Sequence, residues 1–243
     1  MNDAASPNYQ PLYQQIKTLL VSRLAANEWP PGTALPSEIA LAQAYNVSQG
    51  TVRKALNELE IEHMVERRQG RGTFAARHSQ QRSLFQFFHL LSDDNVRELP
   101  VSRVLSCATG EASACERRAL NLTAGASVTR IRRVRDLNQR PVISESLSVP
   151  TAMFPGLAER ALEEVPNTLY EFFETQYGVV VAHASERLRA AAASETDAEL
   201  LGVSAGAPLL AIERRALNLE NRPVEWRLSY CDTAHHFYLN ELD

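Results

Sequence analysis

The sequence has few cysteines, no long apolar run and no excess of positive charge, and each absence excludes a class of protein. Its three cysteines, Cys107, Cys115 and Cys231, are odd in number and lack CxxC spacing, so neither a zinc site nor a disulfide framework is indicated. No apolar run approaches the ~18 residues that a membrane span requires. The segment from Met1 to Gln10 has no signal-peptide pattern, so we expect a cytoplasmic protein without a membrane partner. A net charge of −4 argues against a wholly basic nucleic-acid coat protein.

What the sequence does contain is enough chain for two soluble domains. It has 243 residues, of which 44% are hydrophobic and 22% are charged. The apolar stripe from Leu12 to Leu24 predicts a first helix, which Trp29–Gly32 ends. Ser37 is a good N-cap for a second helix, with Glu38 in its first turn.

A third helix follows after a short turn. Asn46 tolerates the left-handed conformation that this turn requires, and Ser48 is the next N-cap, for a helix that runs to about Glu62. One face of this helix is polar and cationic, as base edges and phosphates require. For an isolated helix a merely solvated face is the alternative, but two capped helices around a short turn favour DNA contact. The polar face comprises Gln49, Gly50, Thr51, Arg53, Lys54 and Asn57.

A short hairpin comes next. The stretch Met64–Arg68 reads as a strand, Gln69–Gly72 as a turn and Thr73–Ala76 as the return strand. The turn places Arg71 at a tip that can reach a DNA minor groove, where the negative potential attracts arginine. A turn with a merely exposed arginine is the alternative. Two capped helices followed by this hairpin predict a winged helix-turn-helix, whose second helix fits the major groove.

This first region resembles the DNA-binding domain of the GntR family of bacterial transcription regulators. The resemblance implies DNA contacts through ten residues: Ser37, Glu38, Ser48, Gln49, Gly50, Thr51, Arg53, Lys54, Gly70 and Arg71. The matching stretches are Leu12–Ile16, Pro31-Gly32, Leu35–Glu38, Leu41-Ala42, Val47-Ser48, Thr51–Arg53, Ala55-Leu56, Leu59 and Arg68–Phe74.

The sequence departs from this family at three positions near the expected DNA contacts. Ile39 and Gln49 stand where family members often carry arginine, and Gly50 stands where a polar residue is common. Glutamine pairs bidentately with adenine, whereas arginine favours guanine. We therefore expect DNA binding with an altered base preference.

The rest of the chain contains an internal repeat. Leu120–Ala126 resembles Leu201–Ala207, at an offset of 81 residues, and the polar turns Asn138–Val142 and Glu220–Val224 are offset by 82. Each copy reads as a short helix, a glycine turn and a two-stranded hairpin. Two such units can pair into one antiparallel sheet with helices on a face, which predicts an α+β fold.

Between and before the two hairpins we expect further elements. Thr168–Phe173 is apolar at helical spacing, with Asn167 or Thr168 as its cap, and Leu157–Leu162 reads as another short helix. A strand begins at Gly178–Ala182 and continues through Arg187–Arg189. The apolar segment Leu84–Leu90 is expected to form an edge strand on the second domain, after a flexible joint.

This second region resembles the UTRA effector domain of the HutC branch of the GntR family. The resemblance implies a chorismate-lyase-like fold that binds a small metabolite and couples it to the DNA-binding heads of a dimer. It rests on Arg130–Arg135, Pro141-Val142, Glu145, Phe154–Leu157, Leu169-Tyr170, Pro223–Glu225 and Ser229.

The residues themselves indicate a polar ligand pocket. Arg133 and Arg135 lie two apart on a strand, so both face the same way and can hold a carboxylate or phosphate bidentately. Glu145, on the paired strand, could hold an arginine or a ligand hydroxyl or amine. A surface ladder of Arg and Glu is the alternative. Together with the positions that touch the effector in the resembled family, the effector-binding candidates are Arg133, Arg135, Glu145, Thr168, Tyr170, Glu225 and Arg227.

Two features near the carboxyl end bear on this site. Cys231 stands where an aromatic hydroxyl is expected in a ligand pocket of this kind. His235 and His236 form a pair without further ligands at metal spacing, so we expect a surface role and no metal site.

The sequence therefore predicts a homodimeric transcription regulator, more a repressor than an activator, that a small anionic metabolite releases from a palindromic double-stranded operator. The metabolite could be a sugar phosphate, a carboxylate or a similar anion, and no cofactor is indicated. The expected domains are a winged helix-turn-helix over 8–77, a joint over 78–83 and an effector and dimerisation domain over 84–243. Two alternatives stay open, an enzyme of the lyase-like fold and a ligand-independent architectural DNA binder.

Overall fold

The structure is a computed structural model that describes residues 10–25, 28–61, 64–76, 88–94, 99–160 and 162–240. The chain separates into two compact units, residues 1–77 and 78–243, and each is described by itself. None of the helices in the described ranges has the length and apolar character that crossing a bilayer requires.

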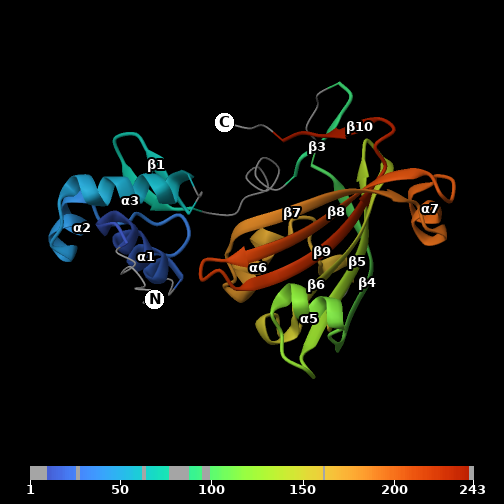
Figure 1. The fold of residues 1–243 in the computed structure, drawn as a ribbon, viewed down its shortest axis with the longest axis horizontal. Coiled ribbons are helices and arrows are strands. Elements are labelled where there is room, and N and C mark those ends of the chain that lie inside the picture. Colours follow the sequence, from blue (N-terminus) through green and yellow to red (C-terminus); the bar gives the residue numbers. More distant parts are fainter. Residues whose placement is uncertain are drawn as a thin grey trace, which may run out of the picture. The chain divides into compact units, whose positions relative to one another are not determined.

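The first unit consists of three helices and a small hairpin (Figure 1). Its helices are α1 (Leu12–Ala25), α2 (Glu38–Tyr45) and α3 (Gln49–Ile61), and the antiparallel strands are β1 (Val65–Arg68) and β2 (Gly72–Ala75). This is the winged helix-turn-helix that the sequence predicts, so that prediction is confirmed.

The predicted helix boundaries of this unit follow from local chemistry. The Ser37 hydroxyl accepts from the Ala40 amide at 3.2 Å, and the Ser48 hydroxyl accepts from the Thr51 amide at 3.1 Å. Asn46 lies in the left-handed region at φ 53° and ends α2, while its own amide donates to the carbonyls of that helix. Asn46 and Ser48 therefore determine the residues at which α2 ends and α3 begins.

Apolar side chains of all three helices form the core of the first unit. Leu20 of α1 and Val52, Leu56 and Leu59 of α3 are fully buried, and Leu41 of α2 is nearly so. Their i, i+4 and i+3 spacing on α3 turns one side of that helix inward. The opposite side of α3, which begins at Gln49, is left exposed.

The second unit is built on a six-stranded antiparallel sheet in the order β4-β5-β6-β9-β8-β7. The two central hairpins are the predicted repeats, and they meet along β6 and β9. The strands are β4 (Val101–Glu111), β5 (Ser127–Leu137), β6 (Arg140–Pro150), β7 (Val181–Ala192), β8 (Pro208–Asn218) and β9 (Pro223–Cys231).

The repeat is longer than the sequence pattern suggested. Each hairpin is preceded by an edge strand and a helix, so β4, α5 (Ala114–Leu120), β5 and β6 match β7, α7 (Glu195–Leu201), β8 and β9. Strand β4 was not predicted, because most of its side chains are at least partly exposed and its sequence shows no clear apolar alternation. The α+β architecture with two paired repeats is confirmed.

The helices α5 and α7 lie on the same face of the sheet. Ser148 of β6 donates to Glu116 of α5 at 2.7 Å, and Ser144 of β6 donates to Asp197 of α7 at 2.9 Å. Because residues four apart on a strand face the same way, these bonds place both helices on one side. Helix α6 (Leu169–Tyr177) packs on the opposite side, in a core with Ile131, Leu147 and Phe154.

Two predicted elements differ in the structure. The helix expected over Leu157–Leu162 is wrong: the described residues form turns, followed by the short 3-10 helix η2 (Leu162–Glu164). The reason is that Gly156 adopts φ 74° and Leu157 is fully buried, which bends the chain instead of coiling it. A second 3-10 turn, η1 (Thr151–Met153), precedes this segment.

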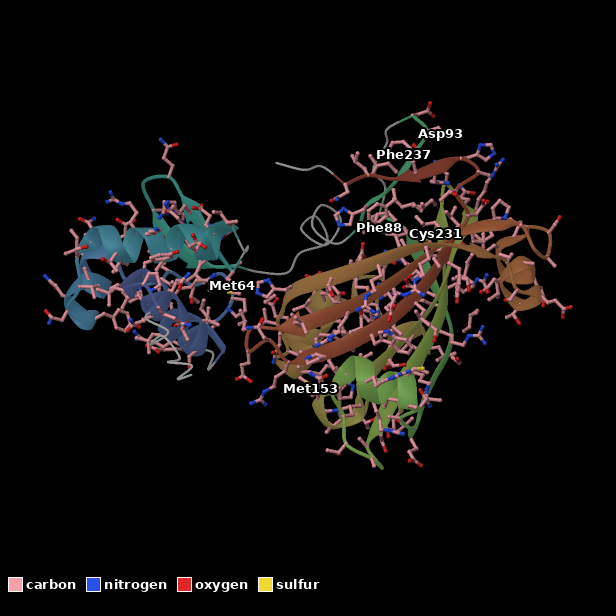
Figure 2. The ribbon with its side chains drawn as sticks, viewed as in Figure 1. Met64, Phe88, Asp93, Met153, Cys231 and Phe237 are labelled. Atoms are coloured by element: carbon pink, nitrogen blue, oxygen red, sulfur yellow. The ribbon has the colours of Figure 1, made fainter. Side chains whose placement is uncertain are left out.

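The edge strand expected over Leu84–Leu90 is mostly outside the described residues, as is the joint over 78–83. Strand β3 runs over Leu90–Ser92 and pairs with β10 (His236–Tyr238), separately from the large sheet. Phe88 precedes it and packs with Leu137, Ile143 and Cys231; Figure 2 labels Phe88 and Cys231 at this end of the unit.

Candidate functional sites

The exposed side of α3 carries the side chains expected to contact DNA. Gln49, Gly50 and Arg53 are exposed near its amino end, where free backbone amides and the helix dipole favour a phosphate. Lys54 turns toward α1, with its ammonium 3.9 Å from the Tyr13 ring centre. Ile39 of α2, at a position that departs from the resembled family, is 59% exposed.

Glu38 organises this surface. Its carboxylate accepts hydrogen bonds from Gln49 at 3.0 Å and from the Arg53 guanidinium at 2.8 and 3.0 Å. Arg67 of β1 donates to its other oxygen at 3.5 Å. Donation by Arg53, followed by Gln49, lowers the pKa of Glu38, so the carboxylate stays ionised and keeps these side chains in place.

The hairpin presents a cation at its tip. Gly70 and Gly72 adopt φ 68° and 105°, a region that side-chain-bearing residues rarely enter, and they flank the exposed Arg71. The Arg71 amide donates to the Arg68 carbonyl at 2.9 Å, which closes the turn. Arg71 therefore lies at the tip of a tight hairpin in the structure, as the sequence predicts.

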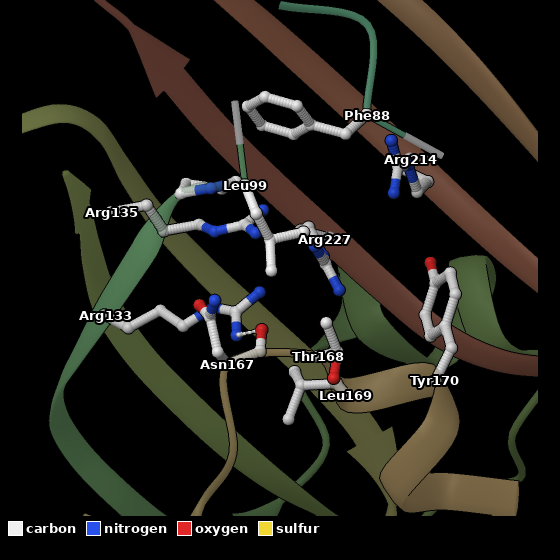
Figure 3. Close-up of a pocket in the computed structure, with 11 residues that line it drawn as sticks. Phe88, Leu99, Arg133, Arg135, Asn167, Thr168, Leu169, Tyr170, Arg214 and Arg227 are labelled. Atoms are coloured by element: carbon white, nitrogen blue, oxygen red, sulfur yellow. Dashed lines mark hydrogen bonds between the residues drawn. The ribbon is translucent and has the colours of Figure 1, made fainter. Parts of the chain in front are cut away.

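The second unit contains an arginine-lined cavity on the sheet face covered by α6. It holds about 390 Å³ of space that is partly open to solvent. Figure 3 shows the guanidinium groups of Arg135 and Arg227 directed toward its centre, with Thr168 and Tyr170 entering from the start of α6. Its lining comprises Phe88, Leu99, Pro100, Arg133, Arg135, Asn167, Thr168, Leu169, Tyr170, Arg214 and Arg227.

Most of the charges around this cavity neutralise one another. Arg133 is bonded to Glu145 on the paired strand, and its other end donates to the Asn167 carbonyl at 3.3 Å. Arg227 donates to both oxygens of Glu225 at 3.0 and 2.7 Å and lies 3.5 Å from Glu145. These side chains are all at least nine-tenths buried, so the surface ladder considered as an alternative is wrong.

The ion pairs of Glu145 determine its charge. Burial by itself raises the pKa of Glu145, but Arg133 and Arg227 outweigh it, and the pKa is lowered below its usual range. Burial also raises the pKa of Tyr170 to about 12, so its hydroxyl keeps its proton and donates to Glu225 at 3.1 Å. The carboxylates are therefore acceptors for the arginines and the tyrosine.

Arg135 differs from the other cavity arginines. It is 92% buried by area, yet no hydrogen bond or ion pair within the described residues reaches its guanidinium, and its Nε is buried without a partner. Its one contact of note is with the Phe88 ring, 5.2 Å from the guanidinium carbon. Burial, together with the charge of Arg133, lowers the pKa of Arg135 to about 9. The charge of Glu145 offsets only part of this effect, so a buried cation without an ion-pair partner is costly, and an anion in the cavity would reduce that cost.

The structure brings all seven predicted effector-binding residues together. Arg133, Arg135, Thr168, Tyr170 and Arg227 line the cavity, and Glu145 and Glu225 lie immediately behind its arginines. Thr168 occupies the N-cap position of α6, although its hydroxyl makes no capping hydrogen bond there. Whether these residues bind an effector stays a prediction.

Sequence reasoning missed Arg214 of the cavity lining. Arg214 donates to Glu186 of β7 at 2.6 Å and raises the positive charge around Tyr170. The repeat contained the signal, because Arg214 lies 81 residues after Arg133 and so occupies the matching position of the second copy. Asn167 and Phe88 carry no such signal, since segments outside the sheet bring them to the cavity.

The residues near the carboxyl end are placed as follows. Cys231 is buried beside Phe88 and Leu137, and burial raises its pKa, so its thiol is an apolar neighbour of the cavity. His235 is exposed, and His236 pairs with Ser92 in the small sheet. In the described ranges no three His, Cys, Asp or Glu side chains have the geometry of a metal site.

Comparisons with known proteins agree with this description. Residues 12–75 match the family described as "Bacterial regulatory proteins, gntR family", and residues 97–236 match the UTRA domain. The mannosyl-D-glycerate transport/metabolism system repressor MngR of Escherichia coli is 31% identical, over 90% of each chain. The transcriptional repressor NagR of Bacillus subtilis is 30% identical, over 84% of this chain and 83% of its own.

A solved structure extends the comparison to the second unit. The ligand-binding domain of a GntR-family transcriptional regulator from Bordetella bronchiseptica is 38% identical, with a TM-score of 0.61. It covers 65% of this chain and 99% of that domain. The relatives named here are transcription regulators, not enzymes.

The fold and its relatives thus define a class, the ligand-responsive DNA-binding repressors. This chain belongs to the gntR family of bacterial regulatory proteins and carries a UTRA domain.

Proposed function

We propose that the effector of this repressor is a small anionic metabolite whose carboxylate or phosphate pairs with Arg135. The observation that carries the proposal is the unpaired state of this guanidinium, which is buried at the cavity while its neighbours are all paired. A planar oxyanion matches the parallel N–H groups of a guanidinium. The relative MngR is named for mannosyl-D-glycerate, which carries a carboxylate.

The other cavity residues have different roles in this proposal. Arg227, which has five N–H groups, and the Thr168 hydroxyl supply further donors to the anion, while the Tyr170 oxygen, whose own proton goes to Glu225, can accept from a ligand hydroxyl. Arg133, Glu145 and Glu225 position these donors, because their own polar atoms are engaged with one another. The residues that line the cavity enclose only a small space, which favours a small metabolite over a larger ligand.

We also propose that the chain acts as a homodimer on a palindromic operator. One winged helix reads only a few base pairs, and two related by a twofold axis read both halves of a palindrome. The DNA contacts would come from three places. These are the start of α2 with its cap (Ser37, Glu38), α3 with its cap (Ser48, Gln49, Gly50, Thr51, Arg53, Lys54), and the wing (Gly70, Arg71). A repressor of this kind works where the operator is, in the cytoplasm.

The proposed domains follow the same division. Residues 8–77 would read DNA, 84–243 would bind the effector and dimerise, and 78–83 would be the joint. Effector binding releases DNA only if the effector binds one arrangement of the heads better than the other.

The experiment is a thermal-shift screen of the full chain with sugar phosphates, amino-acid catabolites and phosphonates, followed by operator-release assays for each ligand that stabilises the protein. We expect at least one small anion to raise the melting temperature and to release DNA. The matched control is Arg135→Gln, which removes the unpaired charge and keeps an unbranched polar side chain at this position.

Two results would contradict the proposal. The first is a ligand that releases DNA equally well from the Arg135→Gln variant, because the anion would then not depend on Arg135. The second is an operator-bound protein that only uncharged ligands release. A monomer that binds the complete operator with full affinity would contradict the dimer.

A further inference from the structure

A second groove lies on the sheet face that carries α5 and α7, the face opposite the arginine-lined cavity. Neighbouring residues on a strand point to opposite faces, so Arg214 of β8 enters the cavity and Arg215 enters this groove. The groove lies between α5 and strands β7 to β9 and holds about 950 Å³, including space open to solvent. Its polar and aromatic lining includes Arg118, Ser185, Arg187, Glu213, Arg215 and Trp226.

The groove has more positive charge than its one carboxylate neutralises. Glu213 accepts from the Trp226 indole at 3.0 Å and lies 3.8 Å from Arg187. Within the described residues, no carboxylate pairs with Arg118 or Arg215. The Nε of Arg215 is buried and has no hydrogen-bond partner. The groove therefore presents two guanidinium groups without counter-charges.

The internal repeat shows whether the arginines of this groove are a feature that both halves of the sheet share. The two halves share helix, turn and sheet geometry, so residues needed only for folding should recur at matching positions. By the offsets of 81 and 82 residues, Arg118, Arg187 and Arg215 correspond to Glu199, Ser106 and Val134, and Trp226 corresponds to Ser144. Neither the arginines nor the tryptophan recur in the other half.

Only one half of the sheet therefore carries these side chains, so the geometry that the two halves share does not account for them. Arginine is suited to bidentate contact with carboxylates and phosphates. The Trp226 ring packs against the α5 core and forms an apolar wall beside the arginines.

We propose that this groove is a second ligand site, which binds a multivalent oxyanion, such as an organic phosphate or a polycarboxylate, between Arg118 and Arg215. Arg187 borders the same space, 3.8 Å from Glu213. The site is on the opposite sheet face from the effector cavity and does not depend on the function proposed for that cavity.

Cys115 gives this proposal a direct readout. It lines the groove and is exposed, and Arg118 donates to its sulfur at 3.5 Å. Cys231 is buried, and burial raises the pKa of the half-buried Cys107, so alkylation should occur first at Cys115. An anion between the arginines would cover this thiol.

The experiment measures the alkylation rate of Cys115 in the full chain by peptide mass spectrometry. Pyrophosphate represents phosphates, citrate represents polycarboxylates, and sodium chloride at equal ionic strength is the reference. We expect pyrophosphate, citrate or both to slow alkylation several-fold, and which one acts identifies the source of the anion. Arg215→Gln should weaken the protecting anion about tenfold, the effect of losing a charge-assisted hydrogen bond.

Two further variants make the test independent of folding. Arg118→Gln changes an exposed side chain and should also weaken protection, even if Arg215→Gln proves unstable. Arg135→Gln, in the other cavity, should leave protection of Cys115 intact. Protection that persists in both groove variants, or that sodium chloride reproduces, would overturn the proposal. Protection that grows with protein concentration without any anion would also overturn it, because a second copy of the chain would then cover this face.

Discussion

Replacing Arg135 by glutamine should make the ligand-free protein more stable and abolish its response to the effector. Most substitutions of a buried residue destabilise a protein. Here the native side chain is a buried cation without a partner, so its removal relieves an unfavourable charge. Sites that bind ligands often hold such unfavourable groups at a cost in stability.

The structure sets a ceiling on the gain. Burial and the charge of Arg133 lower the pKa of Arg135 from its ordinary 12.5 to about 9. At about 1.4 kcal/mol for each tenfold change, this corresponds to about 5 kcal/mol of unfavourable free energy in the charged form. Local rearrangement and water entry reduce such penalties, so we expect a gain of about 1–3 kcal/mol in the free energy of unfolding.

The sign of the pH dependence follows from the same shift. The folded-state pKa lies below the unfolded value, so the penalty is fully present below about pH 9 and declines as the pH rises from there toward the ordinary value of 12.5. The stability difference between Arg135→Gln and the native chain should therefore shrink in alkaline solution. Urea unfolding of both proteins from neutral pH to above pH 9 measures it.

Arg133→Gln is the matched control, two residues away on the same strand. Arg133 is bonded to Glu145 and to the Asn167 carbonyl, so its loss leaves a buried carboxylate with one partner fewer. We expect this variant to lose about 3 kcal/mol or more of stability. If Arg135→Gln also destabilises the protein by such an amount, or keeps its response to the effector, the unpaired arginine is not the anion site and the reasoning fails.

Three further predictions concern other parts of the structure, and a fourth concerns Arg135 itself. Arg53→Ala should weaken operator binding and reduce the slope of log affinity against log salt by about 0.9 if Arg53 contacts a phosphate; an unchanged slope in binding titrations would remove that contact. Asn46→Ala should cost about 1 kcal/mol, since Asn46 sits at φ 53°, whereas Asn46→Gly should be nearly neutral; equal unfolding midpoints would contradict this. Although burial raises the pKa of Glu116, Arg130 and Ser148 lower it to about 2, so Glu116→Gln should destabilise the protein near neutral pH. The difference in unfolding free energy between Glu116→Gln and the native chain should shrink as the pH falls from about 5 towards 2, and unfolding measured across that pH range checks it. The affinity for the effector anion should fall above about pH 9, where Arg135 loses its proton. Calorimetric titration across that pH range measures the affinity, and an unchanged value would contradict the prediction.

Much of the fold could be predicted because its signals are local. Ser37, Asn46 and Ser48 mark helix ends through hydrogen bonds and a backbone conformation that involve only neighbouring residues. The hairpins of the second unit were predictable for a similar reason, since their turn residues and alternation recur twice. The edge strand β4 and the turns at Leu157 gave no comparable signal, because pairing with β5 and burial against α6 decide their conformation.

The candidate cavity was predicted in part. Spacing on β5 put Arg133 and Arg135 on one face, and the resemblance to a known family pointed to partners on β6, α6 and β9. The sequence could not distinguish the two arginines, which look equivalent two residues apart. Only the register of β5 with β6 shows that Glu145 pairs with Arg133 and leaves Arg135 unpaired.

The sequence by itself determined the winged helix, the internal repeat and the family, because caps, turns and periodic apolar residues act over short distances along the chain. Tertiary structure decided which charges are neutralised. Electrostatic pairing depends on distances of a few ångströms between strands that are far apart in sequence. The unpaired Arg135 of the cavity and the unpaired Arg118 and Arg215 of the opposite groove could therefore be found only once the sheet had been assembled.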